Sequence, residues 1–328
     1  MKALLVDHQN GSPVMRTGTF PDPVPGDREL LVKTEAAALN RADLLQKAGK
    51  YPPPDGESPI LGLEMSGVVE QAGKDVEGFK PGDPVFGLLG GGGYAEYCII
   101  DYRMARIIPE NFSFEEAAAI PEVFLTAYQA LFLLGRLEKR ETVLIHAGAS
   151  GVGTAAIQLA RVLKDATVLA TAGTPEKLTL CRELGADLAI NYKKESFAEP
   201  IIEHKGPDST NLIIDFIGAP YWHDNLRIAA TDGRIIYLSM LGGSKIDSIS
   251  LVPVLKKRLT IAGSTLRNRN AEYKIDLMRK FWEDSADKFP KQEIKPVIDS
   301  IYDWKDAEKA HQYMADNRNA GKIILMGM

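Results

Sequence analysis

The part of the sequence best suited to chemistry is a run of small residues, AGASGVG, at 147–153. It follows an apolar run that ends at His146 and precedes an Ala-rich amphipathic stretch from Thr154 to Leu163. After a parallel strand, the next helix offers free backbone N–H groups and the positive end of its dipole, and small side chains let a pyrophosphate approach closely. The glycine spacing differs from G-x-G-x-x-G, so a tight turn that binds nothing is the alternative.

The end of the next strand-like run indicates which dinucleotide this turn would bind. NAD-binding folds usually place an Asp or Glu about 20 residues past the glycines, where it bonds the ribose hydroxyls. Here the run ends ATAGTPEK, at 170–177, with no carboxylate at its tip, and Gly173, Thr174 and Lys177 offer small donors and a cation. This favours a 2′-phosphate and hence NADPH. Glu176 argues mildly against it, and a solvated helix lysine is the alternative for Lys177.

Two parts of the chain differ in periodicity. Residues 1 to about 120 carry short apolar runs separated by Pro and Gly clusters, which is typical of an irregular β barrel or sandwich. From about 122 onward, strand-like runs alternate with helical stretches, which predicts an α/β domain with a doubly wound parallel sheet. The six strand-like runs are TVLIH (142–146), TVLATA (167–172), LAINY (188–192), NLIIDFI (211–217), RIIYLSM (234–240) and LTIAGST (259–265).

Composition argues against several classes of function. The 328 residues carry a formal net charge of only −5, which offers no electrostatic platform for nucleic acid or an anionic membrane. No apolar run approaches the roughly 20 residues that span a bilayer. Cys98 and Cys181 suggest no disulfide framework, and the N-terminal apolar core of four residues is too short for a signal peptide. We therefore expect a cytoplasmic protein with neither nucleic acid nor membrane as partner.

Seven blocks of sequence form a joint signature along the whole chain. They are ALNRADLLQKAGKYPPP (38–54), ILGLEMSGVVEQAG (60–73), GDPVFGLLGGGGYAEY (82–97), AAAIPEVFLTAYQAL (117–131), IHAGASGVGTAAIQLA (145–160), ELGADLAINY (183–192) and NAGKIIL (319–325). Together they resemble the medium-chain dehydrogenase/reductase superfamily, and within it the zinc-free, zeta-crystallin-like quinone oxidoreductases. The resemblance implies a GroES-like catalytic domain at 1–121, completed by 290–328, and a Rossmann domain at 122–289. It also implies homodimers joined along the sixth Rossmann strand, LTIAGST, whose open edge could pair with its symmetry mate.

The zinc-binding branch of this superfamily provides a test for metal. Its catalytic zinc is held by a Cys, a His and a second Cys. The corresponding positions here are Asn40, Leu63 and Glu122, and a leucine cannot ligate a metal. Where that branch has four cysteines for a structural zinc, this chain has only Cys98. The resemblance therefore implies no metal site, and no alcohol oxidation through a metal-bound alkoxide.

Reduction of a quinone needs little beyond orientation over the nicotinamide and a polar partner for the developing oxyanion. In the resembling family an N-x-x-D segment lies near the nicotinamide; here it is Asn40 and Asp43, with the Asn40 amide as a donor to the accepting oxygen. Tyr51 matches an aromatic at the edge of the quinone site. The alternatives are a strand-end Asn bonded to local backbone and an aromatic packed on the turn before PPP. Glycines 90 to 93 are more typical of a flexible surface turn than of a substrate loop.

The resemblance also assigns residues to the cofactor. Tyr192 matches a contact to the adenosine phosphate, and Asn319 a contact from the C-terminal tail. Ser150 replaces a glycine that is frequent in related reductases, so its hydroxyl could either bond the pyrophosphate or narrow the pocket. The expected cofactor-binding residues are Thr126, Ala149, Ser150, Gly151, Val152, Gly173, Thr174, Lys177, Tyr192, Ile217, Ser239, Met240, Leu241, Thr265, Leu266, Arg267 and Asn319.

These observations favour an NADPH-dependent quinone oxidoreductase that transfers hydride without a metal, with ortho-quinones among its substrates. The alternative is a reductase of activated C=C bonds in enals, enones or enoyl thioesters, which motifs cannot separate from the first because both deliver hydride to a conjugated acceptor. A third hypothesis is an RNA-binding or structural protein of the crystallin type. The sequence pI of about 5.7 and the lack of an RNA-binding motif argue against it.

Overall fold

The computed structural model describes residues 1–8 and 13–328, and the chain divides into two compact units. Unit 1 comprises Met1–Leu125, Arg267–Pro290 and Lys295–Met328. Unit 2 comprises Thr126–Leu266 and Lys291–Ile294. The sequence places all of 122–289 in one domain, whereas in the structure Arg267–Pro290 belongs to unit 1.

This difference has a physical cause in helix α9, Ala271–Ser285. The apolar face of the helix buries Phe281, whose ring centroid lies 6.1 Å from that of Phe124 in unit 1. The next residue, Trp282, packs edge-on against Phe86 of the same unit at 5.6 Å. An amphipathic pattern shows that a helix must bury one face, but it does not show against which domain.

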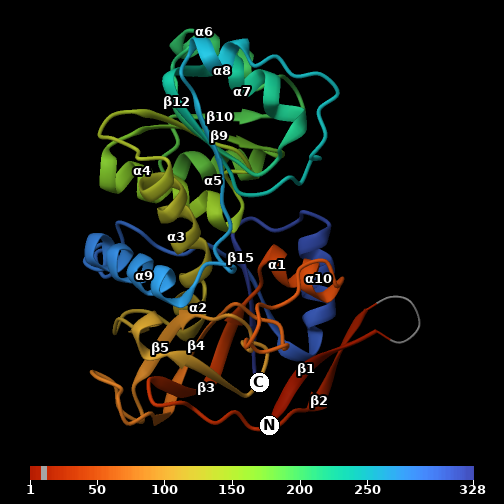
Figure 1. Cartoon of the computed structure of the whole chain (residues 1–328), viewed down its shortest axis with the longest axis vertical. Coiled ribbons are helices and arrows are strands. Elements are labelled where there is room, and N and C mark those ends of the chain that lie inside the picture. Colours follow the sequence, from red (N-terminus) through yellow and green to blue (C-terminus); the bar gives the residue numbers. More distant parts are fainter. Residues whose placement is uncertain (9–12) are drawn as a thin grey trace. The chain divides into compact units, whose positions relative to one another are not determined.

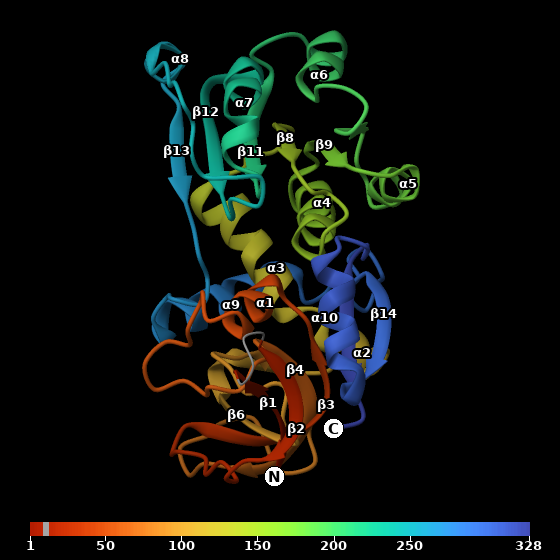
Figure 2. The same cartoon turned by 90° about the vertical axis from the view of Figure 1, so that its right-hand side faces the viewer.

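The six-stranded parallel sheet predicted for the second half of the chain is confirmed in unit 2 (Figures 1 and 2). Its strands run in the order β10-β9-β8-β11-β12-β13, the doubly wound order of dinucleotide-binding folds. The strands are β8 (Thr142–Ile145), β9 (Thr167–Ala172), β10 (Leu188–Asn191), β11 (Thr210–Asp215), β12 (Ala229–Tyr237) and β13 (Thr260–Gly263). The helices are η2 (Gln129–Leu134), α4 (Gly151–Lys164), α5 (Pro175–Glu183), α6 (Ala198–Lys205), η3 (Ala219–Tyr221), α7 (Trp222–Ile228) and α8 (Val252–Lys256).

The centre of this sheet explains why its strands are apolar almost without interruption. Leu144 of β8, Leu169 of β9, Ile213 of β11 and Ile235 of β12 are all fully buried. A parallel sheet has helices on both faces, so both sides of each central strand lie in a core. The carboxyl ends of these strands open at one edge, where such sheets bind their ligands.

Unit 1 is built on a mixed sheet and a separate two-stranded ribbon. The sheet has the order β14-β15-β3-β4-β5-β7, and β6 also pairs with β3. Strands β14 and β15 are parallel, and the other pairs are antiparallel. The strands are β1 (Lys2–Asp7) and β2 (Val14–Thr19) of the ribbon, then β3 (Glu29–Ala38), β4 (Glu64–Ala72), β5 (Pro84–Leu88), β6 (Tyr97–Asp101), β7 (Ala105–Ile107), β14 (Ile298–Asp303) and β15 (Lys322–Met326). The other helices are α1 (Arg41–Lys47), η1 (Tyr102–Met104), α2 (Phe114–Ala118), η4 (Trp304–Asp306) and α10 (Ala307–Ala315); α3 (Pro121–Tyr128) begins in unit 1.

The register of β3 against its neighbours positions the polar residues discussed below. Ala38, at the end of β3, pairs with Ile324 of the antiparallel strand β15, so Asn40 is expected opposite Lys322. On the other side, Ala37 pairs with Met65, which follows Glu64 at the start of β4. Three strand ends thus converge on one place in unit 1.

One helical stretch, Phe114–Leu134, has the length and the mean hydropathy, 1.5, of a membrane span. Glu115, Glu116 and Glu122 interrupt its apolar residues, so no continuous apolar run of this length stands out in the sequence. Of its most apolar window, 72% is buried inside the protein, as is common for the core helix of a folded domain.

Candidate functional site

The small-residue turn of unit 2 has the geometry expected for an anion site. It joins β8 to α4, and Ser150 is the N-cap of this helix: its Oγ accepts a hydrogen bond of 3.1 Å from the N–H of Gly153. A Cβ added to Gly153 would lie 2.4 Å from the carbonyl oxygen of Ala147, so only glycine lets the helix approach the strand this closely. The first N–H groups of a helix have no partner within it, and those of Gly151 and Val152 lie at this end.

A chain of buried polar side chains that was not predicted from the sequence lies next to this turn. His146 Nδ1 lies 3.1 Å from the hydroxyl of Thr171, and His146 Nε2 lies 2.9 Å from the side-chain oxygen of Asn225. The Asn225 amide in turn donates to Asp215 at 2.7 Å. Burial lowers the pKa of His146 and so favours its neutral ring. The Asn225 oxygen can only accept, so the ring carries its proton on Nε2 and accepts from the Thr171 hydroxyl at Nδ1. Polar residues at the ends of buried strands were the available signal.

The same chain reaches the loop after β11. The second oxygen of Asp215 accepts the N–H groups of Ile217 at 2.5 Å and Gly218 at 3.0 Å. This loop pairs with the loop after β12, because Leu241 and Gly242 donate to the carbonyls of Phe216 and Ile217, each at 2.9 Å. Three loops at the carboxyl edge of the sheet are therefore held together by hydrogen bonds.

Two cationic residues lie near the tip of β9. Thr174 is the N-cap of α5 and accepts from the N–H of Lys177 at 3.3 Å. A Cβ on Gly173 would lie 2.8 Å from the Tyr192 hydroxyl and 3.1 Å from Cε of Lys193. The structure thus brings Tyr192 to the tip, as expected, and adds Lys193, which the sequence analysis did not single out.

Glu176 does not replace the missing acid of NAD-binding folds. Its carboxylate accepts from its own backbone N–H and from the Thr174 hydroxyl, and these bonds hold its pKa below the ordinary range. The side chain therefore turns back onto the start of α5, where a negative charge is favoured by the helix dipole.

The remaining cofactor candidates fall into two sets. Met240 and Leu241 are 45% and 53% exposed, beside the loop after β11. Ala149, Ile217, Ser239 and Thr265 follow the carboxyl ends of β8, β11, β12 and β13. Thr126, in α3, and Leu266 are the first and last residues of the main segment of unit 2. Arg267 and Asn319 belong to unit 1 instead, and Asn319 donates to the Gly321 carbonyl of its own turn at 2.8 Å.

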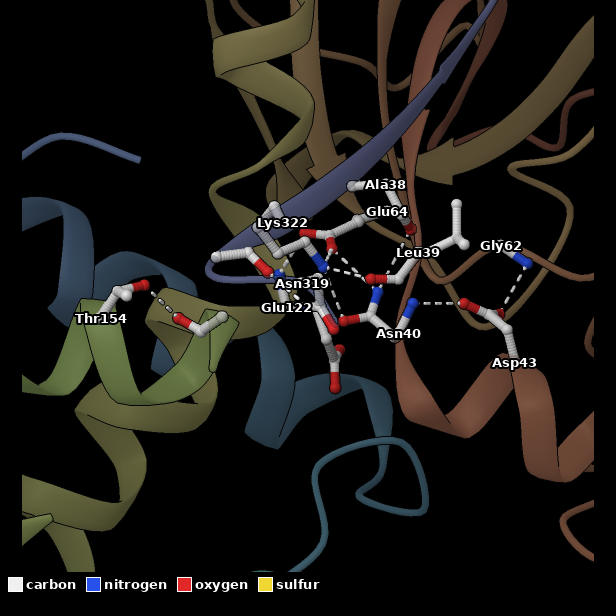
Figure 3. Close-up of polar contacts among 12 residues, drawn as sticks. Ala38, Leu39, Asn40, Asp43, Gly62, Glu64, Glu122, Thr154, Asn319 and Lys322 are labelled. Atoms are coloured by element: carbon white, nitrogen blue, oxygen red, sulfur yellow. Dashed lines mark hydrogen bonds and ion pairs between the residues drawn. The ribbon is translucent and has the colours of Figure 1, made fainter. Parts of the chain in front are cut away.

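In unit 1 a buried ion pair occupies the place where three strand ends meet (Figure 3). Lys322 Nζ lies 2.6 Å from Glu64 Oε1, with the two side chains 3% and 0% exposed. The same ammonium donates to the Leu39 carbonyl at 2.6 Å and to Asn40 Oδ1 at 2.8 Å. The Asn40 amide donates to Glu64 at 2.8 Å. Both ends of the Asn40 side chain are therefore engaged within unit 1, in contrast to the free donor expected from sequence.

Asp43 is also occupied by the protein itself. One oxygen accepts the N–H of Asn40 at 2.7 Å, the other accepts the N–H of Gly62 at 3.1 Å, and the side chain is fully buried. Burial raises its pKa to about 6, and the two backbone N–H groups work against that rise. This geometry makes Asp43 the connection between the start of α1 and the loop before β4.

Glu122 differs from these residues in the state of its carboxyl group. Its backbone N–H donates to Glu64 Oε2 at 2.8 Å, in the first turn of α3. Burial, and then the negative charge of Glu64, raise the pKa of Glu122 to about 8. At neutral pH this side chain is therefore mostly a neutral carboxylic acid, although it is partly exposed.

Tyr51 and Arg267 form a second cluster in unit 1. The guanidinium carbon of Arg267 lies 5.5 Å from the centroid of the Tyr51 ring, a cation–π distance. Arg267 also donates to the Gly90 carbonyl at 2.8 and 3.1 Å. Glycines 90 to 93 are buried, so the expected flexible surface turn is wrong: a Cβ on Gly91 would lie 2.4 Å from the Ser58 carbonyl oxygen.

The donor set in the described part of the chain does not suit a metal. No group of three or more His, Cys, Asp or Glu side chains there could hold a metal ion. Leu63, at the position of a zinc ligand in the zinc-binding branch, is 1% exposed and apolar.

Comparison with known proteins agrees with this architecture. Residues 26–110 match the family model of the alcohol dehydrogenase GroES-like domain, and residues 151–283 match the model of the zinc-binding dehydrogenase. Quinone oxidoreductase-like protein 2 of Bos taurus is 31% identical, over 95% of this chain and 89% of the relative. The chain belongs to the medium-chain dehydrogenase/reductase superfamily, and its relatives include quinone oxidoreductases and quinone oxidoreductase-like proteins.

Two solved structures are similar over the whole chain. The quinone oxidoreductase of Escherichia coli, solved in complex with NADPH, has a TM-score of 0.87 and 27% identity, with 100% of both chains covered. A structure described as an NAD-dependent alcohol dehydrogenase has a TM-score of 0.86 and 31% identity, again with 100% of both chains covered. The predicted combination of a GroES-like domain and a Rossmann sheet is thus confirmed, and the chain is an oxidoreductase by family.

Proposed function

We propose that the chain is an NADPH-dependent reductase that delivers hydride to a quinone without a metal. The observation that carries this proposal is the tip of β9, where Gly173 takes the place of an acid and Lys193 lies beside it. The capped turn at Ser150 and the NADPH complex of the E. coli relative support the same cofactor. The name of the other structural relative refers to NAD, so cofactor preference is the first property to test.

The two units would divide the work. When bound, NADPH supplies the hydride. In unit 2, the start of α4 at Ser150 and Gly151 would hold the pyrophosphate, Lys177 and Lys193 the 2′-phosphate, and the three connected loops the nicotinamide. In unit 1, Tyr51 would offer its ring to a flat conjugated substrate, held in place by Arg267. We assign positioning roles to Asn40 and Asp43, because their polar atoms already have partners within the protein.

Replacing Lys193 by glutamate is expected to lower kcat/KM for NADPH by about 10- to 100-fold, because a charge-assisted hydrogen bond to phosphate is worth roughly 1.5–3 kcal/mol. The rate with NADH should stay nearly unchanged, since NADH carries no phosphate at that position. Steady-state oxidation of each nucleotide with an ortho-quinone measures both. Lys194→Glu, the same charge change at the next exposed residue, is the matched control. Equal rates of wild type with NADPH and NADH would contradict the proposed cofactor.

Reduction of activated C=C bonds is the second candidate function, because it uses the same hydride transfer. An enoyl thioester of coenzyme A would bring several phosphates and so favour a basic channel. The basic run at 256–258 is engaged elsewhere: Lys257 pairs with Asp208 and Arg258 with Asp232. This observation favours small acceptors. Adding an enone and an enoyl thioester to the acceptors of the nucleotide assay separates the candidates.

We also propose that the chain forms a homodimer through β13. This strand is at one end of the sheet order, so one of its edges has no partner strand within the described chain (Figure 2). Near it, Leu251, Val252 and Leu255 are 67%, 54% and 82% exposed, an unusual concentration of bare apolar side chains. Pairing two copies would cover both features.

Sedimentation at micromolar concentration is expected to give a mass twice the 35.9 kDa of the chain. Leu255→Asp should shift the protein to monomers, because it puts a charge into the buried contact. Val24→Asp, at another apolar side chain that is 85% exposed, should leave the dimer intact. A wild-type protein that sediments as a monomer would refute the dimer.

A further inference from the structure

Three carboxyl groups of unit 1 lie close enough to influence one another, and the buried cations Lys322, Lys274 and Arg267 act on the same cluster. The carboxyl groups of Asp43, Glu64 and Glu122 influence one another electrostatically, and Lys322 is paired directly with Glu64. A nearby negative charge in a site of low dielectric opposes the ionisation of a carboxyl group and so raises its pKa.

Hydrogen bonds decide which carboxyl group keeps the proton. Asp43 accepts two backbone N–H groups, and Glu64 accepts from Lys322, Asn40 and the Glu122 backbone. Such bonds stabilise the ionised form. No hydrogen bond from the described residues reaches the Glu122 carboxyl group, so nothing of that kind favours its ionised form.

The surroundings of Glu122 act in the same direction. Burial has the largest effect on its pKa, and the charges of Glu64 and Asp43 add to the rise; Lys322 and Lys274 oppose it. Glu122 also interacts electrostatically with Tyr51 and with Arg267. The pKa of Tyr51 is raised by its own burial and then by Glu122. With a pKa of about 8, Glu122 is matched to proton transfer near neutral pH, whereas Tyr51 is the weaker acid.

We propose that the carboxyl group of Glu122 donates the proton that completes the reduction. The proposal rests on the proposed function, which delivers two electrons and one hydrogen to the substrate as hydride and leaves a substrate anion. The O–H bond of Glu122 breaks, the proton goes to that anion, and the electron pair stays on the carboxylate. Because the Glu122 side chain is partly exposed, the carboxylate regains a proton from water before the next turnover.

This role predicts which substrates need Glu122 most. A hydroquinone anion is a weak base and can leave the protein before it is protonated. The enolate formed from an enone is a much stronger base and must take a proton to give a stable product. A general acid contributes about 10²-fold or more where it is needed. Dependence on Glu122 should therefore increase with the basicity of the reduced anion.

The test compares Glu122→Gln, Glu122→Asp and wild type with an enone and with an ortho-quinone, from pH 6 to pH 10. For wild type we expect kcat with the enone to be level below about pH 8 and to fall above it, since the donor must be protonated. Glu122→Gln should lower kcat about 100-fold with the enone and less than about 10-fold with the quinone. Its kcat should also no longer fall above pH 8. Glu122→Asp should keep a pH-dependent fall. Glu110→Gln, at an exposed glutamate of the same unit, should match wild type.

A second readout does not depend on turnover. Infrared spectroscopy of the protein at pH 6 should show a protonated carboxyl band that disappears through pH 8 and is missing from Glu122→Gln. NADPH affinity, measured by fluorescence titration, should be the same in both proteins. If Glu122→Gln reduces the enone as fast as wild type, or if that band is absent, the proton-donor role is overturned while the proposed reductase stands. If wild type oxidises NADPH with neither acceptor, both proposals are overturned.

Discussion

Replacing Lys322 by methionine is expected to lower the free energy of unfolding by about 3–5 kcal/mol, the usual cost of removing one partner of a buried ion pair. Glu64 would remain fully buried with its charge uncompensated, and the Leu39 carbonyl would lose a 2.6 Å bond. Asn40 would also lose the donor that orients its amide. The position of three strand ends therefore depends on one ammonium group.

Chemical denaturation, read by circular dichroism, measures this effect. Lys305→Met, at an exposed lysine of the same unit, is the matched control and should change stability by less than about 0.5 kcal/mol. The double variant Glu64→Gln with Lys322→Met should recover much of the loss, because it leaves no unpaired buried charge. A single variant as stable as the control would show that the ion pair does not hold the strand ends together.

Replacing Glu122 by glutamine is expected to raise the free energy of unfolding, by an amount that increases with pH. The pKa of Glu122 is raised from 4.5 to about 8 on folding, so the folded state binds the proton more tightly than the unfolded state. The stability that this group contributes is complete below pH 4.5 and is lost as the pH rises to about 8. At about 1.4 kcal/mol per pKa unit, the loss is on the order of 5 kcal/mol. Glutamine has no proton to lose.

Unfolding curves of both proteins from pH 4 to pH 9 check this expectation. The difference in free energy between Glu122→Gln and wild type should be small at pH 4 and largest above pH 8. Groups that Glu122 does not influence titrate equally in both proteins, and Tyr51, whose pKa Glu122 raises, titrates above this pH range, so the difference isolates Glu122. A difference that does not change with pH would mean that Glu122 is ionised in the folded protein at neutral pH.

The architecture of unit 2 was predictable because its signals are local. Each of its six strands is a short apolar run, and each run is separated from the next by turns or helical stretches. The turn before α4 was equally visible, since Ser150 and the glycines act within a few residues of one another. Periodicity and turn chemistry are properties of short segments, so they can be recognised without any knowledge of the tertiary structure.

The site in unit 1 was predictable only in part, because its contacts join distant segments. Lys322 and Glu64 are 258 positions apart, and no sequence pattern connects them. Asn40 was predicted from a motif as a donor to the substrate, but its hydrogen bonds to these two residues occupy its side chain. Glu122 was noted only as a position without zinc. Its pKa is raised by burial and by the neighbouring carboxyl groups of Glu64 and Asp43, and the sequence alone does not show that the fold brings these groups together.

The place of β15 between β14 and β3 affects how the protein folds during its synthesis. Unit 2 comes almost entirely from one continuous stretch and can fold while synthesis continues, since domains generally fold as units as the chain emerges. In unit 1, the end of β3 that pairs with β15 lacks this partner until residues 322–326 have left the ribosome. During that interval its apolar strands are exposed to aggregation, and chaperones would have most to protect there.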